Sequence, residues 1–299
     1  MTMGAARPGA APSHLVVLGE PAAIVKTTLV IAVERMMLHD AEIRRGTDDP
    51  EAIHDARVAV RRFRSHTASL SSVLDVDVIS SQVEHLGAFV RALGAVRDRD
   101  VFLENLAAET AGVPEAIRAD AARIASAVAL ERGAALERLR RSMDAPEHGQ
   151  LLRTLMSIAV DPPLRRPAYA PDPAVVMSSV WKALARRAKA AGRSSPDPVL
   201  HALRIRAKRV RYAAEALAPF VGDRASAFAK AAGRLQDVLG RHQDAVVAID
   251  KLAAVAATDP TLAFAAGWIG AGRERVRVET RAAWPEAWRS LAKKKRRFW

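Results

Sequence analysis

What the sequence lacks excludes several classes of protein at the outset. The 299 residues include no cysteine, which excludes a disulfide scaffold, a thiolate metal site and a cysteine nucleophile. Aromatic residues make up only 5% of the chain, so alanine and branched aliphatic residues supply most of its hydrophobic half. Sixteen glycines are too few for a collagen-like or low-complexity chain, and the hydrophobic content is too high for a disordered one.

Long uncharged runs are also missing from the sequence. A membrane-spanning helix needs roughly 18 consecutive apolar residues, whereas the most apolar stretch, 24–33, is interrupted by Lys26 and followed by a Glu-Arg pair. Residues 1–19 have a short apolar patch in place of the longer run of a secretory signal, so we expect a flexible lead-in there. These features predict a cytoplasmic protein without a membrane partner.

Positive charge is present in excess. Lysine and arginine number 46 against 33 acidic residues, which gives a formal net charge of +13. This excess indicates a polyanionic partner without identifying it. The sequence contains no phosphate-binding glycine loop, no dinucleotide-binding fingerprint, no serine-hydrolase elbow and no zinc-protease motif. Its eight scattered histidines make a poor metal site, and we expect neither a metal nor a cofactor.

The spacing of apolar residues predicts an all-α fold. They recur three and four positions apart, as on the buried face of a helix. Capping residues, prolines and glycines mark the helix ends; Asp49-Pro50, for example, is an N-cap followed by proline at the first helical position. The expected helices are 21–45, 50–74, 78–110, 114–143, a short one at 148–159, 173–191, 198–220, 224–257 and 261–283.

These helices divide into two groups. We expect one four-helix bundle at 20–160 and a second at 173–284, joined by a proline-rich linker at 161–172. Residues 285–299 form a basic tail. This tail either stays disordered and holds anions loosely or docks its terminal aromatic residues on a bundle. The oligomeric state is not predicted by these patterns.

Two motifs occur twice in the chain. The pattern H-x-x-R-[VI]-x-x-[RK]-R-x-R begins at His54 and again at His201, 147 positions later. The pattern L-G-x-x-x-D begins at Leu93 and again at Leu239, 146 positions later. Because both motifs recur in the same order at nearly the same offset, we expect an internal duplication that relates the two bundles by a pseudo-twofold axis.

The first motif forms a line of basic groups on each helix. At about 100° per residue, one histidine and three basic residues of each copy share a narrow face and are spaced about 5–6 Å along the axis. Like charges at this spacing destabilise a helix by a few tenths of a kcal/mol per pair, a cost that a bound polyanion would remove. The alternative is a solvated basic face. The two lines are His54, Arg57, Arg61, Arg64 and His201, Arg204, Lys208, Arg211.

With these motifs the chain resembles the CHAD family, the conserved histidine α-helical domain, over residues 20–285. The run Val96–Val101 is similar to the family's R-D-x-D-V pattern, whereas the second copy keeps only Asp244. The resemblance implies two four-helix bundles with a basic groove or pore between them. It also implies non-enzymatic binding of inorganic polyphosphate, in association with polyphosphate granules. The site residues that it implies are His54, Arg57, Arg61, Arg62, Arg64, His201, Arg204, Lys208, Arg209 and Arg211.

Other interpretations remain open at this point. The same basic lines fit a protein that binds or scaffolds nucleic acid through its phosphate backbone, and a third interpretation is a phosphohydrolase or phosphotransferase acting through His54 or His201. Asp98 and Asp244 have the wrong charge to bind a polyanion, so we expect them to orient arginines. Five further cations either extend the basic track or lie on a solvated surface: Lys26, Arg35, Lys182, Arg186 and Arg187.

Overall fold

A computed structural model describes residues 21–46, 49–110, 112–165 and 171–299 of the chain. Within these ranges the secondary structure consists of nine α-helices and two short 3-10 helices, without a strand, which confirms the predicted all-α fold. The α-helices are α1 (Pro21–Arg44), α2 (Pro50–Ser69), α3 (Ser80–Thr110), α4 (Glu115–Asp144), α5 (Pro146–Val160), α6 (Pro173–Ala190), α7 (Asp197–Val221), α8 (Asp223–Thr258) and α9 (Ala263–Ala292).

Asp-Pro pairs begin two of the helices. The Asp49 carboxylate accepts a hydrogen bond from the backbone N–H of Glu51 at 2.9 Å, and Pro50 occupies the first turn of α2, as predicted. Asp172 caps α6 in the same way, through the N–H of Ala174 at 2.7 Å. Asp197 differs, because it lies inside the first turn of α7 and its carboxylate pairs with Arg277 of α9.

Three hydrophobic cores hold the helices together. The first joins α1, α2 and α5 with the adjacent halves of α3 and α4, around residues such as Phe63 and Leu139. The second joins α6 and α7 with the start of α8 and the end of α9, around Trp181 and Leu235. The third joins the far ends of α3 and α4 to those of α8 and α9, around Ile124. The structure therefore differs from two separate four-helix bundles by this third core.

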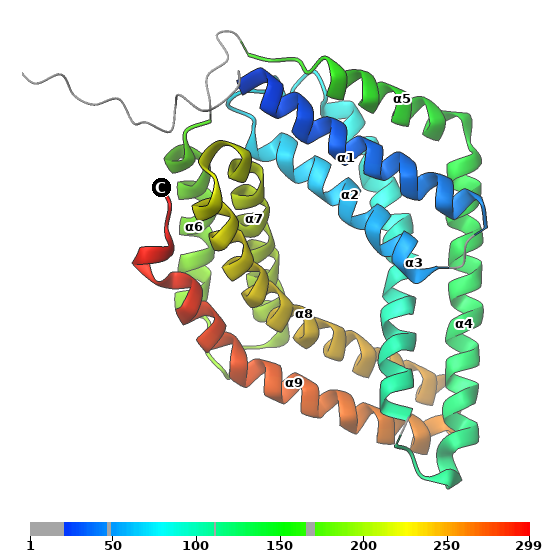
Figure 1. The fold of residues 1–299 in the computed structure, drawn as a ribbon. Helices are drawn as coiled ribbons and strands as arrows, with labels where there is room; N and C mark the ends of the chain where they lie inside the picture. The colour runs from blue at the N-terminus through cyan, green and yellow to red at the C-terminus, as the bar shows by residue number, and fades with distance from the viewer. Residues whose placement is uncertain (1–20, 47–48, 111, 166–170) are drawn as a thin grey trace, which may run out of the picture.

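Helix length explains the third core. At 1.5 Å per residue, the 36 residues of α8 extend about 54 Å, far beyond the helices that they cover in their own half. The long hairpins α3–α4 and α8–α9 consequently reach past each half and meet at their tips. Figure 1 shows the resulting closed frame, with α2 and α7 on its inner side.

The C-terminal residues dock on the second core. Helix α9 continues through the expected boundary at 284/285 and ends at Ala292. Beyond it, Trp299 packs edge-on against Trp181 and Phe228, with ring centroids 5.9 and 5.0 Å apart. Of the two alternatives for the tail, docking of its aromatic residues is confirmed.

The segments expected before and between the two halves are described only in part. The lead-in at 1–19 lies outside the described residues, as do 166–170 of the expected linker. The described start of the linker runs back along the first half, where Leu164 forms an isolated antiparallel bridge with Leu74. Within the described ranges, no helix is both long enough and apolar enough to cross a membrane.

Candidate functional site

Helices α2 and α7, which carry the repeated basic motif, pack against each other at the centre of the molecule. Their basic side chains converge on Lys208, which is half-buried. Burial, together with the charges of four arginines, lowers the pKa of Lys208 to about 7. Three of these arginines come from α2 and one from α7, so both motif helices contribute to one cluster. The four are Arg57, Arg61, Arg64 and Arg204.

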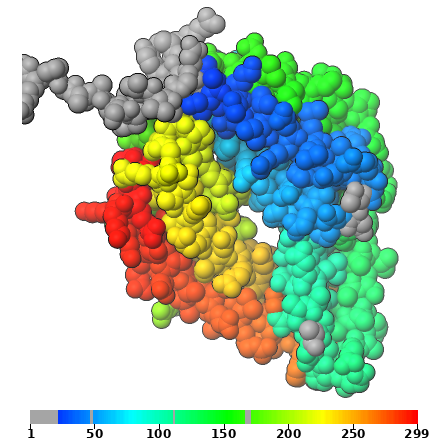
Figure 2. All heavy atoms as spheres, in the orientation of Figure 1, coloured from blue at the N-terminus to red at the C-terminus, as the bar shows by residue number. Residues whose placement is uncertain are grey.

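This cluster borders a hollow of about 860 Å³ that we call the cationic hollow. Its walls come from α2, α3, α6 and α7, and none of its lining residues is acidic. No carboxylate among the described residues lies within ion-pair distance of its five basic side chains. Figure 2 shows an opening between the two halves of the molecule near its centre. The basic residues that line the cationic hollow are Arg61, Arg64, Arg204, Lys208 and Arg209.

Glycines of the second motif make room for arginines of the first. A Cβ atom at Gly94 would lie 3.7 Å from Cζ of Arg57, so the guanidinium rests directly on α3. One turn farther along α3, Asp98 accepts a hydrogen bond from Nη1 of Arg57 at 3.0 Å. The expectation that Asp98 orients an arginine is thereby confirmed.

The second copy of the motif repeats this arrangement with a variation. A Cβ atom at Gly240 would lie 3.6 Å from Nε of Arg204, which rests on α8 as Arg57 rests on α3. Burial raises the pKa of Asp244, against the opposing effect of the Arg204 charge. Asp244 and Arg204 are thus electrostatic partners, without the direct hydrogen bond of the first copy.

Both motif histidines are half-buried near the starts of their helices. His54 lies close enough to Arg97 of α3 that burial and this arginine lower the pKa of the imidazole. Nδ1 of His201 lies 2.7 Å from Oε1 of Gln243 on α8. The prediction omitted Arg97, although the R-D-x-D-V run contains it; its guanidinium also pairs with Glu104 at 2.8 Å.

Two of the predicted residues lie elsewhere. Arg62 and Arg211 line a second hollow of about 590 Å³, formed by α1, α2, α7 and α8, which shares no lining residue with the cationic hollow. Glu215 joins them there, since Oε1 accepts a hydrogen bond from Nε of Arg211 at 2.7 Å and Oε2 lies 3.9 Å from Nε of Arg62. We call this second space the Glu215 hollow.

The sequence model of the CHAD domain family matches residues 29–253 of this chain. The chain belongs to the CHAD domain family. The CHAD domain of the plant Ricinus communis has a similar fold, with a TM-score of 0.71, 23% identity and 92% of each chain covered. PptA from Streptomyces chartreusis is also similar, with a TM-score of 0.70 and 20% identity over 91% of this chain and 100% of that one.

Two curated relatives are longer than this chain. Both are uncharacterized proteins of Mycobacterium tuberculosis, MT2285 and Rv2226, and each is 27% identical over 259 residues. The match covers 84% of this chain but only 48% of each relative. The chain therefore spans about half the length of the curated relatives that it matches.

The five additional cations do not join the central cluster of this CHAD domain. Lys26 and Lys182 are exposed on α1 and α6, and Arg35 lines the Glu215 hollow. Arg186 and Arg187 line a separate hollow of about 330 Å³ between α6 and α7. These five residues therefore lie at the surface, away from the cluster around Lys208.

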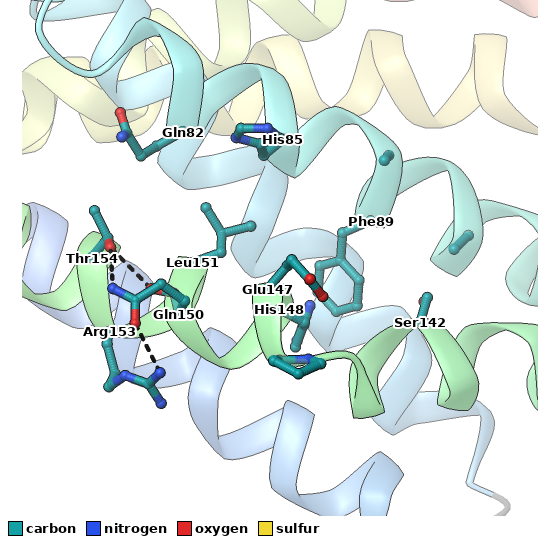
Figure 3. A pocket seen from close by; sticks show the side chains of 13 residues that line it. Gln82, His85, Phe89, Ser142, Glu147, His148, Gln150, Leu151, Arg153 and Thr154 are labelled. Carbon is teal, nitrogen blue, oxygen red and sulfur yellow. Dashed lines mark hydrogen bonds between the residues drawn. The ribbon is translucent and has the colours of Figure 1, made fainter.

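A further hollow of about 720 Å³ lies between α3 and α5, and no sequence pattern pointed to it. Figure 3 shows Gln82, His85 and Phe89 of α3 facing Leu151 of α5 across it. His148 packs edge-on against Phe89, with centroids 4.7 Å apart, and its Nε2 lies 2.6 Å from the buried Asp40. This lining is mixed and carries no concentration of positive charge. No group of side chains among the described residues is arranged to hold a metal ion.

Proposed function

We propose that this CHAD domain binds inorganic polyphosphate in the cationic hollow, without chemically altering it. The observation that carries the proposal is the cluster around Lys208, in which cations of two helices face one another and only Arg57 has a carboxylate, that of Asp98, within ion-pair distance among the described residues. A structure that only needed a solvated basic surface would keep such charges apart, because their repulsion and burial disfavour the charged lysine. A bound anion removes both costs.

The composition of the cluster favours phosphate oxygens as the ligand. Arginine offers a planar fork of N–H donors that can hold two oxygens of one phosphate. Successive cations one helical turn apart suit a linear chain that carries a charge on every unit. The cations approach from both α2 and α7, which favours a narrow single strand over a rigid double helix. Granule association follows if the chain meets polyphosphate in its condensed form.

The absence of catalysis is part of the proposal. Binding and catalysis would differ in what they require of the two histidines. A phosphotransferase needs an imidazole that reaches the phosphate chain, whereas neither histidine lines the cationic hollow in which we place that chain. Nδ1 of His201 lies against Gln243, and no acidic residue of the described ranges lines the cationic hollow to act as a general base. We therefore expect neither released phosphate nor a phosphohistidine.

The first experiment is a titration with long-chain polyphosphate at several salt concentrations. We expect log K to fall linearly with log salt, by about 0.7 for each phosphate contact on a single strand. The double variant Arg61→Gln/Lys208→Gln should bind at least 10-fold more weakly and have a slope smaller by about 1.4. The control Arg138→Gln/Arg141→Gln removes two exposed cations of α4 and should bind like the wild type. Equal losses in both double variants would refute the site.

A competition experiment separates the proposal from nucleic-acid binding. Single-stranded RNA and duplex DNA are added to the polyphosphate complex at equal phosphate concentration. We expect polyphosphate to remain bound, because it carries a charge on every unit and no bases that the cationic hollow would have to accommodate. Displacement by RNA at equal phosphate would support the nucleic-acid function instead. Inorganic phosphate is measured in the same samples, and its time-dependent release would contradict the non-catalytic part.

A further inference from the structure

The cationic hollow and the Glu215 hollow occupy corresponding places in the fold. The offset of 147 residues that relates His54 to His201 also pairs Arg64 with Arg211, and Arg62 with Arg209. One arginine of each pair lines the cationic hollow and the other lines the Glu215 hollow. The two spaces therefore present the same two arginine positions on opposite sides of the contact between α2 and α7.

The corresponding positions next to these arginines differ in charge. Glu215 lies four residues after Arg211 and pairs with it, whereas Ala68 lies four residues after Arg64. Both Glu215 and Ala68 line their respective hollows. Arg64 consequently has no carboxylate within ion-pair distance among the described residues, while Arg211 is held by one at 2.7 Å.

The remaining lining increases this difference between the two sides. The Glu215 hollow contains Asp237 in addition to Glu215, against four basic side chains, whereas the cationic hollow has five basic side chains and no acidic one. His66 lines the Glu215 hollow where Ala213 lines the other, and burial and Arg62 lower the pKa of His66 to about 4. At neutral pH His66 therefore adds no positive charge.

We propose that Glu215 is a specificity-determining residue that confines a bound polyanion to the side of the cationic hollow. It does so by neutralising Arg62 and Arg211, the two arginines that would otherwise continue the basic track through to the opposite side. This inference rests on the proposed function. It adds that the track is one-sided and that Glu215 limits its length.

The test uses the charge-neutral replacement Glu215→Gln in the full chain. Glutamine keeps an oxygen that can accept the hydrogen bond of Arg211, so the packing of α7 is preserved. With long-chain polyphosphate we expect at least 3-fold tighter binding and a salt slope steeper by about 0.7–1.4, the contribution of one or two released arginines. With tripolyphosphate, which is too short to reach both sides, we expect no change from the wild type.

The reciprocal variant and a control make the result specific. Ala68→Glu places a carboxylate one turn after Arg64, on an exposed position of α2, and should weaken binding of both long and short polyphosphate at least 3-fold. The control Glu286→Gln removes an exposed acid of α9 and should leave affinity and slope unchanged. Thermal unfolding of each variant, followed by circular dichroism, checks that the helices are intact.

The outcomes separate the two proposals. If the wild type binds polyphosphate and Glu215→Gln binds with the same affinity and slope, the role of Glu215 is refuted while the proposed function stands. A gain that is equal for long chains, for tripolyphosphate and for the Glu286→Gln control would reflect net charge alone and would also refute it. If the wild type does not bind polyphosphate at all, both proposals fail together.

Discussion

Lys208 offers a direct measure of the electrostatic cost of the site. Its pKa lies about 7 in the folded protein, whereas in an unfolded chain it lies near the ordinary lysine value of 10.5. Each unit of difference corresponds to about 1.4 kcal/mol. After allowance for solvent screening of this half-buried group, the charged lysine costs the folded state about 2–4 kcal/mol.

The replacement Lys208→Met should therefore stabilise the protein in a pH-dependent manner. Below pH 7 the lysine is charged in both states, and the folded state bears the whole cost. Between pH 7 and 10.5 the folded protein has released a proton that the unfolded chain still holds, so the stability of the wild type rises with pH. Above pH 10.5 both states are neutral and the cost is absent.

Urea unfolding at pH 6, 8 and 10, followed by the helical signal in circular dichroism, measures this difference. We expect Lys208→Met to raise the free energy of unfolding by about 2–4 kcal/mol at pH 6 and by less than about 1 kcal/mol at pH 10. Lys189→Met, at an exposed lysine of α6, should have a small effect that does not vary with pH. A stability gain independent of pH, or a loss at pH 6, would refute the crowding of charge around Lys208.

Two further predictions concern stability away from the site. Deletion of Phe298 and Trp299 should lower the free energy of unfolding by about 1–3 kcal/mol, because it removes aromatic contacts from the second core, and it should leave polyphosphate affinity unchanged; calorimetry and titration check both. Asp40→Asn should cost about 1–3 kcal/mol at pH 7. Burial raises the pKa of Asp40, but hydrogen bonds from His148 and Arg44 outweigh it and lower the net value. The difference in the free energy of unfolding between Asp40→Asn and the wild type should shrink below pH 3.8, as Asp40 becomes protonated. A difference that persists there would contradict the role given to the hydrogen bonds of the ionised carboxylate.

The helices and the basic motif could be predicted because their signals are local. Apolar spacing, the Asp49-Pro50 cap and the proline at 173 depend on residues within one or two turns, and the structure places these helix starts where expected. The recurrence of the motif at a fixed offset predicted that α2 and α7 carry equivalent basic lines. The resemblance to the CHAD family, and not the recurrence, implied a basic groove between the two halves.

The side on which each cation lies could not be predicted from one helix alone. Arg61 and Arg62 are adjacent in sequence, yet they line different hollows, because successive residues of a helix are about 100° apart. The partner of Arg62 is Glu215 of α7, far away in the chain. The third core escaped prediction for a similar reason, since the apolar residues at the tips of the long helices have the same spacing as those of the other two cores.

The third core allows the cationic cluster to lie between the two halves of the molecule. Facing cations on α2 and α7 repel each other, so their contact alone would not hold the two halves in register. The long hairpins α3–α4 and α8–α9 meet at a distance and bury residues such as Ile124 and Ile269, which holds the halves together without neutralising the charges between them. Asp98 pairs with Arg57, but none of the five basic side chains that line the cationic hollow has such a partner among the described residues. Closure through the tips leaves the positive charge around Lys208 available to a ligand.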